Sequence, residues 1–411
     1  LPKKKRRPFA TDMYLTHLSL TEFRAFTRLD LDVPRRVLVL VGDNAQGKTS
    51  VLEAIYYLAT FSSFHTTSDR QLVNFQSSGQ ELAVTRLVAE FMRAEKKHRL
   101  EVRLILEAGG NGGARLRREI LVDGVKRTAN ETMGMFNAVL FLPQMTRILE
   151  NGPEERRRYL NLALGQALPG YAQALSDYDK ALTQRNALLK QLAERGGDTG
   201  QLQYWDELLA DRGATLIHAR IGAVHEMERM AARAHQRLSH GQEVLRLLYQ
   251  PAYDPLPKPE GQMGLPLKTP VKRNGITREQ IRQGFLQKLN SLRSEEIARG
   301  VTTTGPHRDE MRFLGNGIDL GDYGSRGQIR TTLMSLKLAE VEWLKARTGQ
   351  WPVLLLDEIL AELDTTRRAD LLETLGEAEQ AVLTTTDLNL FEPRFVEQCA
   401  LWNVEAGQVM P

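Results

Sequence analysis

The sequence predicts an α/β protein in which a mixed β-sheet with helices and an antiparallel β region are joined by an inserted helical lobe. Three observations over the 411 residues predict this fold. Short β-rich runs at the start lead into a glycine turn and a helix. Apolar and polar residues then alternate between residues 81 and 125. From Pro153 onward, the apolar spacing changes to three and four residues, which indicates helices.

The β-rich part begins with the runs YLTHLSLTEF, LDLDV and VLVLVG, which are separated by turn residues. Valine-, leucine- and threonine-rich runs of this length are typical of strands. The third run ends in a glycine turn, and SVLEAIYYLAT follows with helical spacing. The later runs ELAVTRLVAEFM, HRLEVRLILE and RREILVDG alternate between turns such as GGNGG, which predicts an antiparallel sheet beside the first strands.

The helical part predicts a hairpin of two long helices. Its first arm is ~37 Å long at about 1.5 Å per residue, which is far too short for a long coiled-coil arm. GGDTG at 196–200 separates the arms, and the second arm runs to about Gly241. The apolar positions of the first arm recur at three- and four-residue steps: Leu175, Tyr178, Leu182, Leu189 and Leu192.

Six prolines between residues 251 and 270 predict a loop or extended linker. A helix is expected to resume over 277–299, and the α/β pattern returns from Thr302. These changes predict three parts. Residues 1–12 form a basic flexible extension, 13–145 with 340–411 form one lobe, and 146–339 form a largely helical second lobe.

The charge balance argues against a global attraction to polyanions. The net charge is +4, and residues 1–12 account for it with five basic side chains and one acid. Nucleic acid would therefore be held by local patches. The single cysteine, Cys399, excludes a disulfide framework and a cysteine-rich metal site, and fits a reducing compartment. No run reaches the ~18 apolar residues of a membrane span, so we expect a cytoplasmic protein without a membrane partner.

The stretch GDNAQGKT, Gly42–Thr49, matches the phosphate-binding pattern G-x-x-x-x-G-K-[ST] between a β run and a helix. Backbone N–H groups at such a turn cradle phosphates, the lysine reaches the outer phosphates, and the hydroxyl ligates Mg²⁺. The alternative is an ordinary glycine-rich turn with a capping threonine, which the strand-and-helix context disfavours. The candidate nucleotide-binding residues are Gly42, Asn44, Gly47, Lys48, Thr49 and Ser50.

VLLLDE, residues 353–358, predicts a buried strand that ends in two acids. At its carboxyl end Asp357 can hold Mg²⁺, and Glu358 can orient and deprotonate an attacking water. Hydrophobic runs that end in Asp-Glu are common in α/β proteins. The pairing with the phosphate cradle is what makes this run informative.

A second anion-binding turn is predicted by DYGSRGQIRT, where Ser325 and Gly327 precede a helix. Taken alone, this could be only a capped helix start. A single mononucleotide cannot easily occupy two cradles in one subunit. Two subunits placed head to tail could each offer this turn to the γ-phosphate held by the other, so the pattern favours an ATP-dependent homodimer.

The order of an S-x-G-Q turn, a helix, LLLDE and then AELD at 361–364 resembles the signature, Walker B and D-loop elements of ATP-binding-cassette ATPases. Within that class the chain is similar to the RecF family of bacterial recombination mediators. The resemblance implies that the fold is an SMC-like ATPase head. The resemblance spans about Met13 to Arg368. It rests on FRAF, GDNAQGKTSVLEAIYYLA, PEERRRYLN, TTGPHRDEMRF, GSRGQIRTTLMSLKLAE and LLLDEILAELDTTRR.

The resemblance implies roles by position for ATP and Mg²⁺. Lys48 and Thr49 would serve phosphate and metal, and Gln144 in FLPQ would be the Q-loop residue that faces the metal and the attacking water. Ser325, Gly327 and Gln328 would form the signature presented to the partner subunit. Asp357, Glu358 and Asp364 would be the metal, catalytic and D-loop acids.

The chain also departs from the family pattern. Ala45 stands where the cradle commonly has glycine, which matters only if that position requires a positive φ. Asn161 stands where relatives often have aspartate. TTTD replaces the switch histidine of many cassette ATPases, so Thr386 or Asp387 could take that place. His307 and Arg308 belong to a family motif, but the sequence assigns neither a task.

The resemblance further implies a weak, DNA-stimulated ATPase that acts as a timed clamp in DNA repair. It would bind double-stranded, gapped or junction DNA and, with RecO and RecR, promote loading of RecA onto single strands covered by SSB. No sequence-reading motif is evident. The candidate DNA-binding residues are Lys96, Lys97, Arg99, Arg115, Arg117 and Arg118. The alternatives are a transporter ATPase subunit and a component of a cassette-like nuclease.

Overall fold

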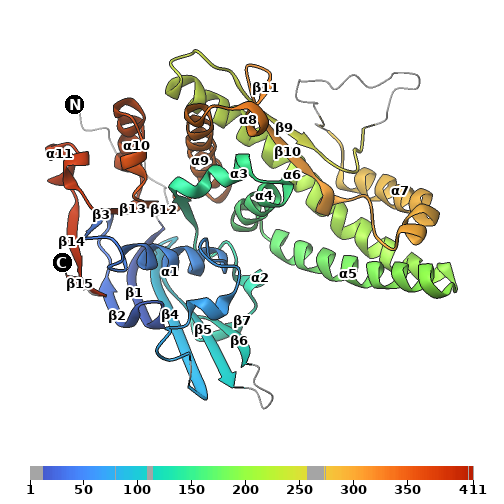
Figure 1. Cartoon of the computed structure of the whole chain (residues 1–411), viewed down its shortest axis with the longest axis horizontal. Coiled ribbons are helices and arrows are strands. Elements are labelled where there is room, and N and C mark those ends of the chain that lie inside the picture. Colours follow the sequence, from blue (N-terminus) through green and yellow to red (C-terminus); the bar gives the residue numbers. More distant parts are fainter. Residues whose placement is uncertain are drawn as a thin grey trace. The chain divides into compact units, whose positions relative to one another are not determined.

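The computed structural model describes residues 13–78, 80–108, 114–256, 273, 275–405 and 407–410. The basic segment 1–12, the GGNGG turn and most of the six-proline segment therefore lie outside the described residues. The chain divides into two compact units, which Figure 1 shows. The first unit comprises residues 1–145 and 340–411, and the second comprises residues 146–339.

One sheet of the first unit is antiparallel and has the strand order β2-β1-β4-β5-β6-β7. Its strands are β1 (Tyr14–Phe23), β2 (Phe26–Asp32), β4 (Leu82–Arg93), β5 (Lys96–Ala108), β6 (Ala114–Val122) and β7 (Val125–Arg127). Leu20, Leu87 and Val102 lie opposite one another on neighbouring strands and are fully buried. The adjacent cross-strand set of Thr21, Arg86 and Arg103 is partly exposed. The alternation in the sequence is therefore the alternation between core and surface.

The other sheet of the first unit is mixed, as predicted, with the order β15-β14-β3-β13-β12-β8. The pairs from β14 across to β8 are parallel, and β15 pairs with β14 antiparallel. Its strands are β3 (Arg36–Val41), β8 (Ala138–Phe141), β12 (Val353–Asp357), β13 (Gln380–Thr385), β14 (Ala400–Glu405) and β15 (Gln408–Met410). Parallel strands end at the same edge, so the turns after β3, β8, β12 and β13 meet there.

Helix α1 (Lys48–Thr60) lies between the two sheets of the first unit (Figure 1). It contacts β8, β12 and β13 on one side and β4 and β5 on the other. Most of its residues are buried, and its apolar side chains share one core with residues of both sheets. This double burial explains why the helix is apolar on nearly every face.

A buried amide also joins the two sheets. Gln380, at the start of β13, accepts a hydrogen bond from the backbone N–H of Leu15 in β1 at 2.7 Å. Its Nε2 donates to the carbonyls of Leu15 and Pro34, both at 2.9 Å. Gln380 is fully buried, and these bonds satisfy both ends of its side chain, as a polar group in a core requires.

The remaining elements of the first unit connect these sheets. They are η1 (Asp69–Leu72), α2 (Ala129–Thr132), η2 (Pro143–Thr146), η5 (Ile359–Glu362), α10 (Thr365–Glu377), η6 (Leu388–Leu390) and α11 (Pro393–Val396). Most of η2 belongs to this unit. Helix α9 (Arg326–Thr348) begins in the second unit and ends in the first.

The second unit is largely helical, and α5 and α6 form the predicted hairpin (Figure 1). Its helices are α3 (Arg147–Glu150), α4 (Pro153–Ala167), α5 (Tyr171–Arg195), α6 (Leu202–Leu238), α7 (Arg278–Arg299) and α8 (Leu320–Tyr323), with short turns η3 (Thr199–Gln201) and η4 (Pro306–Arg308). A three-stranded sheet consists of β9 (Leu245–Gln250), β10 (Glu310–Gly315) and β11 (Ile318–Asp319). Strand β9 was not predicted from the sequence.

A buried charge network joins the elements of the second unit. The guanidinium of Arg220 on α6 donates to Asp309 Oδ2 at 2.7 Å, to the carbonyl of Pro306 at 2.6 Å and to Asn161 Oδ1 at 2.9 Å. Tyr249 on β9 donates to the same aspartate. A buried guanidinium is tolerated only when its donors are satisfied, and here they are. The GPHRD motif and Asn161 therefore have a structural function in this unit.

His307 has a bracing position in the same motif. Tyr178 Oη lies 2.7 Å from His307 Nδ1, and His307 Nε2 lies 3.3 Å from the carbonyl oxygen of Thr302. A neutral imidazole satisfies both contacts when Tyr178 donates to Nδ1 and Nε2–H donates to the carbonyl. Burial lowers the pKa of His307 to about 4, which favours this neutral form.

We predict that His307 makes the second unit sensitive to acid. The pKa of His307 in the folded protein, about 4, lies below the ordinary histidine pKa of about 6.5, so the proton binds the unfolded chain more tightly. The free energy of unfolding therefore falls progressively as pH drops from about 6.5 to about 4. Between pH 7 and pH 5 the wild type should lose roughly 2 kcal/mol more than His307→Asn. Unfolding by denaturant at both pH values measures this difference. His218→Asn, at an exposed position of α6, should retain the wild-type dependence, and equal slopes in wild type and His307→Asn would contradict the assignment.

Candidate functional site

The phosphate-binding turn follows β3, and its backbone geometry explains its glycines. A Cβ on Gly42 would lie 2.2 Å from the carbonyl oxygen of Val404, so only glycine fits against β14. Gly47 has a φ of 108° and is the N-cap residue immediately before α1. Ala45 has a φ of 64°, in the left-handed region. The position does require a positive φ, so alanine is strained there.

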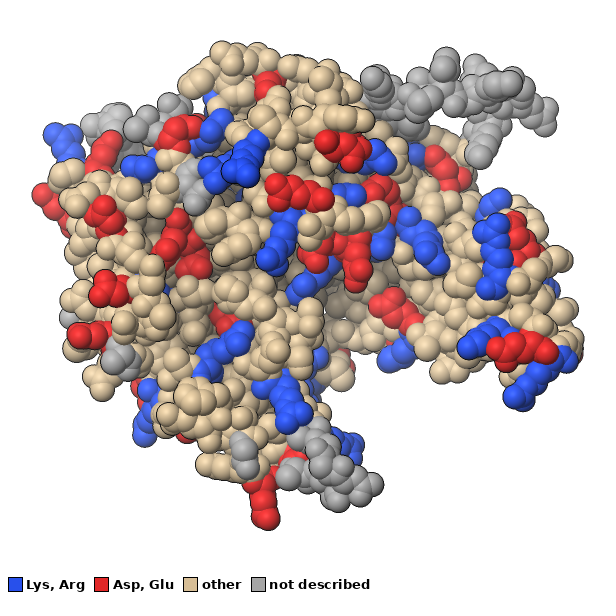
Figure 2. Space-filling model, viewed as in Figure 1, with Lys and Arg blue, Asp and Glu red and all other residues tan. Residues whose placement is uncertain are grey.

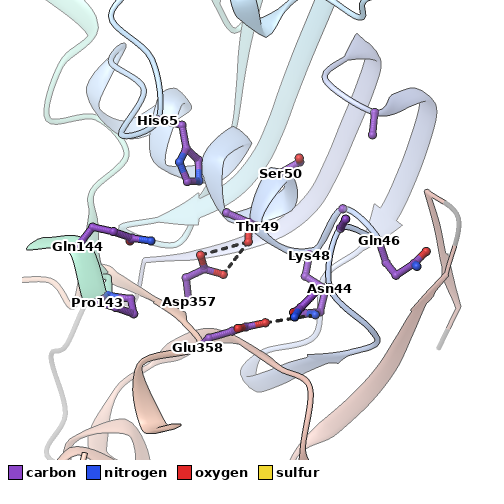
Figure 3. Close-up of a pocket in the computed structure, with 13 residues that line it drawn as sticks. Asn44, Gln46, Lys48, Thr49, Ser50, His65, Pro143, Gln144, Asp357 and Glu358 are labelled. Carbon is purple, nitrogen blue, oxygen red and sulfur yellow. Dashed lines mark hydrogen bonds and ion pairs between the residues drawn. The ribbon is translucent and has the colours of Figure 1, made fainter. Parts of the chain in front are cut away.

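A cavity of about 350 Å³ opens where the turns after β3, β8 and β12 meet (Figure 3). This volume is within the range of small-molecule sites. The first unit supplies the whole lining. The lining residues are Ala25, Asn44, Ala45, Gln46, Gly47, Lys48, Thr49, Ser50, His65, Pro143, Gln144, Asp357 and Glu358.

Lys48 is held over the turn from which it projects. Its Nζ donates to the carbonyls of Gly42 at 2.6 Å and Asp43 at 2.9 Å, and lies 3.3 Å from Glu358 Oε1 (Figure 3). The side chain is only 4% exposed. A buried ammonium with these partners is oriented before any ligand arrives, and it supplies positive charge at the floor of the cavity.

Asp357 receives hydroxyl donors from two elements. Thr49 Oγ1 donates to its carboxylate at 2.9 and 3.1 Å, and Thr384 Oγ1 donates to Oδ1 at 2.7 Å. Thr384 Oγ1 also accepts from the backbone N–H of Glu358 at 3.1 Å. The hydroxyl of Thr49 and the carboxylate of Asp357 are hard oxygen donors, which fit Mg²⁺.

Thr384 is a residue that sequence reasoning missed, because the comparison with a switch histidine pointed further along TTTD. Neither Thr386 nor Asp387 lines the cavity. Asp387 instead accepts from the backbone N–H of Asn389 and caps η6. Thr384 lies beside Asp357 because it is the residue paired with it across β12 and β13.

His65 was also missed, and its signal was weak. It lies in the turn after α1, where its backbone N–H donates to Ser63 Oγ at 2.9 Å. Ser63 donates to the buried carboxylate of Glu53, and Arg24 of the FRAF motif donates to the same carboxylate at 2.7 and 2.8 Å. FRAF therefore braces α1 and the His65 turn. Gln144 lines the cavity and points toward Thr49 and Asp357 (Figure 3).

The predicted signature turn at Ser325 and the predicted D-loop residue Asp364 each lie at the start of a helix. In the second unit, Ser325 and Gln328 form a reciprocal cap: Ser325 N–H donates to Gln328 Oε1 at 2.9 Å, and Gln328 N–H donates to Ser325 Oγ at 3.2 Å. Ser325 and Gly327 are exposed. In the first unit, Asp364 accepts from the N–H of Arg367 at 2.9 Å and caps α10.

The candidate DNA-binding residues do not form one free cationic patch. Lys97 pairs with Glu90 at 2.7 Å, and Arg118 donates to the carbonyl of Phe61 and to Asp69. Arg99 lies 3.4 Å from Glu101, and Arg117 pairs with Glu119. On the face seen in Figure 2, basic and acidic side chains are interspersed. Lys96 and Arg115 are exposed.

Cations are nevertheless outermost on the outer face of the antiparallel sheet. Glu101 is only 7% exposed, whereas the neighbouring Arg99 is 46% and Arg103 is 40% exposed. Hydrogen bonds from Arg86 lower the pKa of Glu101 to about 2. The acid therefore stays ionised, and it is more deeply buried than the arginines that contact it.

Among the described helices, every one falls short of the length and apolar character that crossing a bilayer requires.

Comparison with known proteins finds relatives that match nearly the whole chain. The family model for the RecF/RecN/SMC N-terminal domain matches residues 14–404. Proteins named DNA replication and repair protein RecF are 38% identical in Roseiflexus castenholzii, over 97% of this chain and 100% of that protein, and 38% identical in Chloroflexus aurantiacus, over 97% and 99%. A solved structure of the recombination mediator RecF with ATP, in the RecFOR pathway, has 29% identity and a TM-score of 0.80 over 98% of this chain and 99% of that one.

We predict that Ala45→Gly stabilises the first unit. Removing a left-handed alanine recovers about 1–2 kcal/mol, and the greater freedom of glycine in the unfolded chain offsets about 0.4–1 kcal/mol of this. The expected gain in the free energy of unfolding is therefore up to about 1.6 kcal/mol, measured by chemical denaturation. Ala369→Gly is the matched control, because it places the same change at an exposed position inside α10 and should destabilise by about 1 kcal/mol. If both variants were destabilised equally, the strain at Ala45 would be refuted.

Proposed function

The chain belongs to the RecF/RecN/SMC family, and from that premise we propose that it is an ATPase that binds DNA and acts in recombinational DNA repair in the cytoplasm. One observation carries the proposal. Lys48, Thr49, Asp357 and Glu358 come from segments that lie about 300 residues apart, and they line the same cavity at the carboxyl edge of a parallel sheet. That edge is where α/β proteins bind nucleotides.

The roles of the cavity residues follow from their positions. The N-terminus of α1 and the buried ammonium of Lys48 would hold the β- and γ-phosphates of ATP. Thr49, Asp357 and Gln144 would hold Mg²⁺ through oxygen atoms. The ion, when bound, neutralises charge that develops on the phosphate oxygens. Asn44, Gly47 and Ser50 line the same turn and would complete the cradle.

Glu358 would activate the water that attacks the γ-phosphate. Its carboxylate is 39% exposed in the cavity and lies 3.3 Å from Lys48, so it reaches the space where phosphate would sit. Its φ of 47° is a left-handed conformation, and its backbone N–H is fixed by Thr384. A glutamate held in this way can orient water and accept its proton.

The signature turn would act on a second copy of the chain. Ser325 is exposed at a helix N-terminus, where an anion is favoured, and the ATP cavity draws its lining from the first unit alone. We propose that two copies pair head to tail so that the partner's Ser325, Gly327 and Gln328 contact the γ-phosphate, with Asp364 at the same interface. The bound nucleotide would then control a monomer–dimer equilibrium.

DNA would be held by its backbone and shape. The exposed Lys96 and Arg115 and the outward edges of Lys97, Arg99 and Arg117 can contact phosphates without reading bases. Arg118 is more engaged with its own unit and contributes less. By its family membership the chain would act on double-stranded, gapped or junction DNA with RecO and RecR, so that RecA is loaded onto single strands covered by SSB.

The first test is the molar mass in solution, measured by light scattering with and without a non-hydrolysable ATP analogue. We expect the wild type to double in mass only with the analogue, because two shared nucleotides close the interface. Ser325→Arg should bind the analogue and stay monomeric, since a long side chain fills the turn. Ser294→Arg, at an exposed position of α7, should dimerise normally. An analogue-dependent dimer of Ser325→Arg would refute the role of the turn.

Glu358→Gln should bind ATP but lose at least about 100-fold in turnover, because glutamine cannot accept the proton of the attacking water. Steady-state phosphate release and the affinity for a fluorescent ATP analogue measure the two effects separately. Glu373→Gln, at an exposed position of α10, is the control and should hydrolyse ATP at the wild-type rate. Undiminished turnover in Glu358→Gln would remove Glu358 from the general-base role.

A further inference from the structure

A chain of hydrogen bonds leads from the Ser325 turn into the core of the second unit. Gln328, which caps Ser325, uses its side-chain Nε2 to donate to Glu243 Oε1 at 2.7 Å. The other carboxylate oxygen of Glu243 lies 3.2 Å from His235 Nε2 on α6. His235 Nδ1 lies 3.1 Å from Ser335 Oγ, two helical turns further along α9. This series of hydrogen bonds therefore contacts α9 at two points, Gln328 and Ser335.

The two contact points lie on one face of α9. Gln328 and Ser335 are seven residues apart, close to two full turns, so their side chains leave the helix on the same side. Contacts at both points oppose rotation of α9 about its axis. The Ser325 turn leads directly into α9, so a rotation of the helix about its axis would change the direction that the turn faces.

Two donors in these contacts follow from the chemistry of the groups. Ser335 Oγ donates its single proton to the carbonyl of Thr331 at 2.7 Å. The carboxylate of Glu243 only accepts, so His235 donates Nε2–H to it. The bond holds Glu243 from the side opposite Gln328.

The same three groups occur in the Ser–His–acid triad of hydrolases, but here they cannot attack a substrate. His235 and Ser335 are both 0% exposed, and Glu243 already binds Gln328 with its other oxygen. Glu243 itself is 20% exposed. The arrangement is therefore suited to holding a structure in place, and the structure it holds is the exposed cap of α9.

We propose that Glu243, backed by His235, is a positioning residue for the anion-binding turn at Ser325. The inference rests on the proposed function, in which that turn contacts the nucleotide of a second copy. Glu243 acts through Gln328 and does not touch the ATP bound by its own subunit. Its loss should therefore weaken nucleotide-dependent pairing and leave nucleotide binding by the monomer intact.

The test compares Glu243→Ala with Glu243→Gln. Glutamine keeps an oxygen for Gln328 and offers an N–H to a neutral His235, so it should restore most of the function. We expect Glu243→Ala to raise the protein concentration needed for analogue-dependent dimerisation by about tenfold, the scale of one lost hydrogen bond to a charged group. Glu243→Gln should stay within about threefold of wild type. Affinity for a fluorescent ATP analogue, measured on the monomer, should be unchanged in both. Glu194→Ala, an exposed acid on α5, is the control.

Amide hydrogen exchange gives a second readout that does not depend on dimerisation. In Glu243→Ala without nucleotide, a peptide covering residues 324–330 should exchange faster, while peptides from α5 should be unaffected. Wild-type exchange together with wild-type dimerisation in Glu243→Ala would overturn the inference and leave the proposed function standing. If the wild type itself does not dimerise with analogue, the proposed function fails, and the exchange result alone decides whether Glu243 orders the turn.

Discussion

The burial of α1 between two sheets is the constraint on which the first unit depends. The helix closes the core of the antiparallel sheet on one side and of the mixed sheet on the other. Its first residues are also the floor of the cavity. The burial that stabilises the fold therefore sets the position of Lys48 and Thr49, and Arg24 and Glu53 fix the same helix from the side.

Several buried charged and amide side chains in both units have partners that fix their direction. In the first unit, Asp357 takes two hydroxyl donors and Gln380 ties strands of the two sheets together. In the second unit, Arg220 gathers carbonyl, carboxylate and amide oxygens from residues between 161 and 309. Interactions of this kind add modest net stability, but they specify one arrangement of the chain.

The sequence predicted the fold class because its periodicities are long and regular. The alternating runs became β4, β5 and β6, and the three- and four-residue spacing became α5 and α6. Strand β9 was missed because it is defined by pairing with β10, about 60 residues later, and not by its own pattern. The motifs predicted that Lys48, Asp357 and Glu358 belong together. The roles assigned to them, to the signature turn and to the DNA-binding residues remain predictions. His65, Thr384 and the left-handed backbone of Ala45 depend on tertiary packing, which no local pattern reports.

The pairing of β3 has a consequence for synthesis on the ribosome. Both neighbours of β3, β13 and β14, come from beyond residue 379, although β3 itself ends at Val41. At ~5–20 residues per second, the strand that carries the phosphate-binding turn emerges roughly 20–70 s before either partner exists. The second unit is continuous and can close much earlier. The nascent chain therefore carries an apolar strand with two open edges for most of its translation, and this strand is where we expect chaperones to engage it.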